Sequence, residues 1–72
     1  MWHNDIKVNA TFAAGGFKDV WAHLGTLGWR RIKTGASESV SNLYTLLSGA
    51  HAHDRPVNAH LDGDEIDIAY LK

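Results

Sequence analysis

The second half of the chain constrains the fold most, because a helical pattern there precedes two alternating segments. One helix face is marked by residues at three- and four-residue spacing: Val40, Leu43, Tyr44, Leu47, Ala50 and His51. A proline disfavours helical backbone at the residue before it. Because Pro56 follows Arg55, we expect the helix to end by about His53 or Asp54.

Two short segments after Pro56 have the pattern of a β-hairpin. Residues 57–61 and 66–71 alternate apolar and polar side chains, which is typical of half-buried strands. Asp62-Gly63 lies between them, and Asp-Gly is one of the strongest short-range hairpin signals. The second half therefore predicts a helix followed by a hairpin.

The first half contains three further strand-like segments. Residues 6–12 place Ile6, Val8, Ala10 and Phe12 on one face. Residues 17–24 place Val20, Ala22 and Leu24 on one face and Asp19, Trp21 and His23 on the other. Residues 25–28 contain two glycines, which favour a hairpin loop, and residues 29–33 form the third segment.

This order of elements predicts one mainly β domain of the α+β class over residues 1–72. Five short strands with a helix after the third fit a small OB-like barrel or sheet, and a β-grasp arrangement or an open α+β sheet is the alternative. We expect the helix face, with Val40, Leu43, Tyr44 and Leu47, to pack against Ile6, Val8, Val20, Ile32, Val57, Leu61, Ile66 and Ile68.

The small size of the chain predicts a homo-oligomer. A domain of 72 residues buries a modest fraction of its surface, and the absence of cysteine excludes disulfides and thiolate metal sites. Apolar residues occur on both faces of the second and fifth predicted strands. A net charge of -1 argues against non-specific attraction to nucleic acid, and the longest apolar runs are too short for membrane insertion.

Side chains that could support catalysis or bind a metal lack the spacing that these functions need. His51 and His53 are two residues apart, so they diverge on a helix and suit its C-terminal end instead. The acidic segment 62–67 lacks the ligand spacing of a calcium loop. No G-x-S-x-G nucleophile elbow is present. We therefore predict no enzymatic activity, no metal and no cofactor.

The aromatic strands of the first half are the candidate binding surface. Trp21 and Trp29 flank the predicted hairpin loop, and tryptophan combines a flat apolar face with a polar edge. With His23 and Arg31 they form the predicted site for a glycan or protein ligand, and two core tryptophans are the alternative. Arg30, Arg31 and Lys33 beside Trp29 also fit a single-stranded nucleic-acid-binding OB module.

The order of elements, the segment Trp29-Arg30-Arg31-Ile32 and residues 39–71 resemble the small OB-type B subunits of five-B-subunit bacterial toxins. The resemblance implies a ring-forming, non-catalytic subunit that binds glycans at the cell surface. It also implies that edge strands pair between neighbouring subunits and that the helix lines a central pore. Ser41, Asn42, Thr45 and Ser48 would then face the pore.

Overall fold

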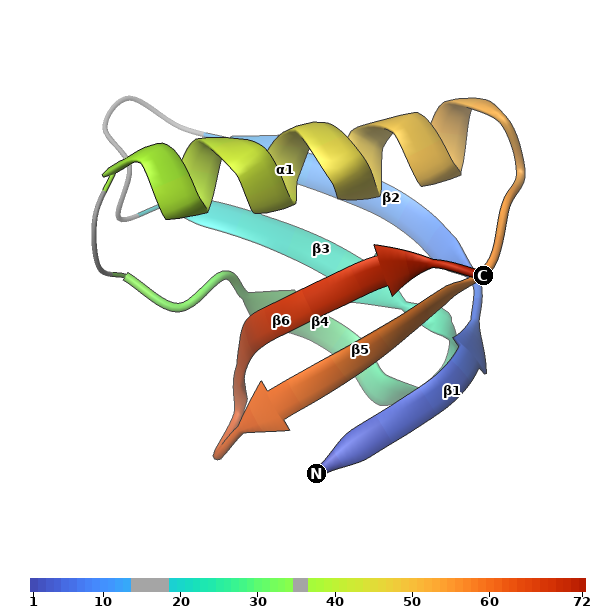
Figure 1. Cartoon of the computed structure of the whole chain (residues 1–72), viewed down its shortest axis with the longest axis horizontal. Helices are drawn as coiled ribbons and strands as arrows, with labels where there is room; N and C mark the ends of the chain where they lie inside the picture. The colour runs from blue at the N-terminus through green and yellow to red at the C-terminus, as the bar shows by residue number, and fades with distance from the viewer. Residues whose placement is uncertain (14–18, 35–36) are drawn as a thin grey trace.

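The computed structural model describes residues 1–13, 19–34 and 37–72, which form six strands, one 3-10 helix and one α-helix (Figure 1). The start of the predicted second strand, at residues 17–18, lies outside the described residues. The elements, in chain order, are β1 (Trp2–Ile6), β2 (Val8–Ala13), β3 (Val20–Leu24), η1 (Gly25–Leu27), β4 (Gly28–Arg31), α1 (Ser37–Ala52), β5 (Val57–Asp62) and β6 (Glu65–Leu71).

The six described strands form two three-stranded antiparallel sheets, in the orders β1-β5-β6 and β2-β3-β4. Lys7 alone separates β1 from β2, so the chain passes directly from one sheet to the other. The sheets meet again through a parallel bridge between Ile32 and Ile66, and the N–H of Lys33 donates to Ile66 O at 2.8 Å. The mainly β prediction with one helix is confirmed, whereas the count of five strands is wrong, and the described strands form two sheets and not a closed barrel.

The strand absent from the prediction is β1, which pairs with β5. Its sequence, Trp-His-Asn-Asp-Ile, has no two-residue alternation of apolar side chains. The pairing is also irregular, because the register shifts between His3 and Ile6, and Asp5 has a φ of 61°. The N–H of Asp5 donates to the side-chain oxygen of Asn58 at 2.8 Å, which stabilises this bend.

The core lies between the two sheets and under α1, which packs across β2, β3 and β6 (Figure 1). Val40 and Leu47 of the predicted helix face are buried, and Leu43 and Tyr44 are partly buried against the same cluster. Seven of the eight predicted sheet partners are buried or packed on the core: Ile6, Val8, Val20, Ile32, Val57, Leu61 and Ile66.

The prediction of an inward-facing Ile68 is wrong, because its side chain is 49% exposed. In the β5–β6 hairpin, Leu61 pairs with Ile66 but His60 pairs with Ile68, so Asp67 is an extra residue on β6. Such a bulge reverses the face on which the following residues lie. Ile68 and Tyr70 consequently point outward, and Asp67 reaches His60, with Oδ1 2.7 Å from Nδ1.

The helix ends at Ala52, close to the predicted position, and the chain then turns through Asp54, whose φ is 52°. His51, predicted on the buried face, is exposed, and its Nδ1 lies 3.0 Å from Val8 O. Ser41, Asn42 and Thr45 are exposed. Within the described part of the chain, no helix is both long enough and apolar enough to cross a membrane.

Candidate ligand-binding site on the outer face of the β2-β3-β4 sheet

The β3–β4 hairpin brings the four predicted site residues together on one face. Along β3, Val20, Ala22 and Leu24 are buried, so the intervening Trp21 and His23 face outward. The register then sets Trp21 opposite Arg31 and His23 opposite Trp29. Directly opposed residues lie on the same face of an antiparallel pair. The hairpin therefore brings these four side chains beside one another.

Each pair is in direct contact. The guanidinium carbon of Arg31 lies 5.0 Å from the centroid of the Trp21 ring, within the range of a cation–π interaction. The His23 and Trp29 rings meet edge to face, with centroids 5.4 Å apart. The side-chain amide of Asn9 donates to His23 Nδ1 at 3.0 Å and to Gly25 O at 3.3 Å. His23 therefore supports one side of the Trp29 ring, which remains 49% exposed.

Phe12 joins this face, although the sequence pattern placed it on the same strand face as Ile6 and Val8. The register of β2 shifts between Val8 and Ala10, so Thr11 pairs with buried Ala22 and Phe12 pairs with Trp21. The bulge thus reverses the side on which Phe12 lies. Phe12, Trp21 and Trp29 line an apolar groove with a volume of about 310 Å³.

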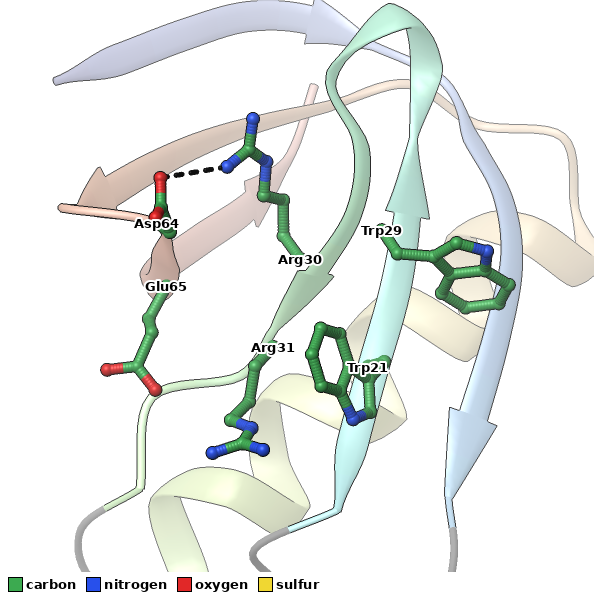
Figure 2. Close-up of a pocket in the computed structure, with 6 residues that line it drawn as sticks. All are labelled: Trp21, Trp29, Arg30, Arg31, Asp64 and Glu65. Atoms are coloured by element: carbon green, nitrogen blue, oxygen red, sulfur yellow. Dashed lines mark hydrogen bonds and ion pairs between the residues drawn. The ribbon is translucent and has the colours of Figure 1, made fainter.

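A second hollow of about 370 Å³ adjoins the groove and supplies charge. Figure 2 shows Trp21, Trp29 and Arg31 beside one another, with Arg30 reaching the turn between β5 and β6. The hollow is lined by Trp21, Trp29, Arg30, Arg31, Asp64 and Glu65. Asp64 and Glu65 were predicted only as part of a solvated turn, and no local pattern indicates their place in this hollow.

Two ion pairs fix the β5–β6 turn against β4. Arg30 Nη1 lies 3.0 Å from Asp64 Oδ1, and Arg30 Nε donates to Leu27 O at 3.2 Å. Lys33 pairs with Asp62. Their hydrogen bond, reinforced by the opposite charge, holds the pKa of the Asp62 carboxyl below its usual value and raises the pKa of Lys33. These contacts hold the charged wall of the hollow next to the aromatic groove.

The remaining histidines do not extend the site. His51 and His53 are exposed at the end of α1. His3 and His60 belong to the other sheet, where His60 contacts Asp67 and Trp2. Among residues 1–13, 19–34 and 37–72, no three His, Asp or Glu side chains are grouped to hold a metal ion.

The groove and hollow together offer flat aromatic faces, two guanidinium groups and two carboxylates. An apolar surface with a few convergent polar groups is the usual character of a site for a small ligand. Comparisons of the chain with protein-family models, curated proteins and solved structures found no match.

Proposed function

We propose that the protein is a non-enzymatic binding module that recognises a glycan at the groove formed by Phe12, Trp21 and Trp29. The observation that carries this proposal is that Phe12 and Trp29 are exposed, and Trp21 is partly exposed, on one sheet face beside charged groups. A sugar ring has an apolar C–H face and a polar rim of hydroxyls. It would stack on Trp29 while its hydroxyls bond to the charged wall.

The path of the chain supports an OB-type fold for this module. If β1 and β2 are taken as one strand bent at Lys7, the elements follow the order strand, strand, strand, helix, strand, strand. The bridge from Ile32 to Ile66 brings the third and fifth of these strands together. OB folds bind oligosaccharides and oligonucleotides on the face of strands two and three and on the loop between strands four and five. Here these are β3, β4 and the turn with Asp64.

Charge favours a glycan over a nucleic acid as the ligand. Two of the three basic residues in the predicted nucleic-acid cluster are already paired, Arg30 with Asp64 and Lys33 with Asp62. Single-strand binding depends on a positively charged groove that follows the phosphates. Asp64 and Glu65 line the hollow beside Arg31, so this surface lacks the continuous positive charge that a phosphate backbone needs.

Replacing Trp29 with alanine is expected to weaken glycan binding at least tenfold, because the largest exposed stacking surface of the groove is lost. Glycan-array screening would identify a ligand, and titration calorimetry would measure the loss. Trp2→Ala is the matched control, since Trp2 is similarly exposed, at 45% against 49%, but lies on the other sheet. This control should bind like the native chain.

Equal binding by both tryptophan variants, or an array without any bound glycan, would contradict the proposal. Salt-sensitive binding to a single-stranded oligonucleotide, lost on replacing Arg31, would support the nucleic-acid module instead. Circular dichroism of each variant would show that the loss of binding is not a loss of folding.

We also propose that the module works as a homo-oligomer in which β6 of one copy pairs with β2 of the next. Both strands are at a sheet edge among the described strands, and apart from the bridge between Ile32 and Ile66 these edges pair with no other described strand. Unpaired edges are natural sites for association. Pairing two different edges makes a head-to-tail contact, which closes into a ring when the rotation permits. Each copy would contribute one aromatic groove, so the assembly would bind a glycan-bearing surface with avidity.

Replacing Leu71 with proline is expected to dissociate this oligomer. Lys72 N–H donates to Pro56 O across β5, so by antiparallel alternation the N–H of Leu71 points to the free edge. Proline removes that donor, whereas the control Leu71→Ala keeps it. Sedimentation velocity at tens of micromolar should show an oligomer for the native chain and the control. A native monomer, or a proline variant that stays assembled, would contradict the proposal.

A further inference from the structure

Arg31 is a cation without a partner among the residues that the structure describes. It makes no hydrogen bond or ion pair there, and its Nε is buried without an acceptor. Four other cations form ion pairs, Lys7 with Asp54, Arg30 with Asp64, Lys33 with Asp62, and Lys72 with Asp5, and Arg55 donates to Lys72 O. A buried donor that lacks an acceptor lowers stability, so this guanidinium would gain from a ligand that supplies an acceptor group.

The surroundings of Arg31 suit an anionic ligand group. Its guanidinium lies over the Trp21 ring, which orients the planar donor fork and excludes water from one side. The same ring forms a wall of the apolar groove. A carboxylate accepts two parallel N–H bonds from a guanidinium, and such charge-assisted pairs are stronger than neutral hydrogen bonds.

We propose that the glycan bound at the groove is an acidic one, whose carboxylate pairs with Arg31 while its ring stacks on Trp29. This inference rests on the proposed function and names its ligand class. The sugar ring covers the apolar groove, and the carboxylate occupies the adjoining hollow beside Trp21 (Figure 2).

Glu65 makes the inference sharply testable, because its carboxylate lines the same hollow. Asp64 is neutralised by Arg30, whereas Glu65 forms no ion pair within the described residues. Glu65 would therefore repel a ligand carboxylate, and Glu65→Gln should strengthen the binding of acidic glycans. A neutral glycan should respond little to the same change.

The test uses oligosaccharides that end in uronic or sialic acid and the same compounds with the carboxylate reduced to an alcohol. The native chain should bind the acidic forms at least tenfold more tightly than the reduced forms. Arg31→Gln should remove this preference, and Arg31→Lys should keep only part of it, since lysine retains the charge but not the fork. Glu65→Gln should increase affinity for the acidic forms about threefold or more.

The results of this test distinguish a failure of the acidic-ligand inference from a failure of the proposed glycan-binding function on which it rests. Equal affinity for the acidic and reduced forms, or an Arg31→Gln variant that weakens both alike, would overturn the acidic ligand and leave the glycan module standing. Preference for sulfated oligosaccharides over carboxylated ones would also overturn it. Binding of neither form would reject the glycan module together with this inference. Because Arg31→Lys preserves the charge beside Trp21, it reports on recognition even if the glutamine variant folds poorly.

Discussion

Replacing Ile66 with alanine is expected to lower the free energy of unfolding by about 2–5 kcal/mol, whereas Ile68→Ala should cost less than about 1 kcal/mol. The two isoleucines lie two residues apart on β6, so a regular strand would place them on the same face. The bulge at Asp67 separates them instead, leaving Ile66 fully buried and Ile68 49% exposed.

Ile66 is a sensitive position because it lies where the two sheets meet. It pairs with Leu61 within its own sheet and with Ile32 across the junction. Truncation removes buried methyl groups and leaves a cavity that the surrounding strands fill only partly. A chain of 72 residues is expected to have a stability of about 4–11 kcal/mol, so this loss is a large share of the total.

Urea denaturation followed by tryptophan fluorescence would measure both variants in one experiment. The midpoint of Ile66→Ala should fall far below that of Ile68→Ala, with similar slopes. Comparable losses for the two variants would mean that β6 alternates without a bulge, as its sequence alone predicts.

Regular alternation explains which parts of the fold could be predicted from the sequence. The β3 pattern and the helix face containing Val40 and Leu47 are regular, and the structure agrees with both. The errors at Phe12 and Ile68 have one cause, since a register shift on β2 and another on β6 reverse the faces that follow. A bulge is set by pairing with another strand, so a two-residue pattern within one strand does not reveal it.

The candidate site also contains residues that the sequence could place and residues that it could not. Trp21, His23, Trp29 and Arg31 belong to one hairpin without a register shift, so local alternation was enough to place them together. The other lining residues arrive from elsewhere: Phe12 from β2, and Asp64 and Glu65 from the β5–β6 turn. Their approach depends on how the two sheets meet, which is a property of tertiary packing.

Replacing Gly28 with alanine is expected to lower the free energy of unfolding by about 1–3 kcal/mol. Gly28 connects η1 to β4 with φ 80° and ψ -159°, a region that residues with a Cβ rarely adopt. No neighbour lies within 4 Å of an added Cβ, so the cost comes from backbone strain and not from a clash. Because Trp29 follows directly, relaxation of this strain would also displace the more exposed of the two indole rings in the groove.

Gly49→Ala is the matched control and should raise the free energy of unfolding, whereas Gly28→Ala should lower it. Nothing lies within 4 Å of a Cβ added at Gly49, so alanine fits there without a clash. Gly49 lies inside α1, where alanine is favoured by about 1 kcal/mol because glycine loses more backbone entropy on folding. Thermal unfolding should therefore shift the two midpoints in opposite directions. A stabilising Gly28→Ala would show that the β3–β4 connection adopts an ordinary backbone. Backbone strain would then not be the reason for a glycine beside Trp29.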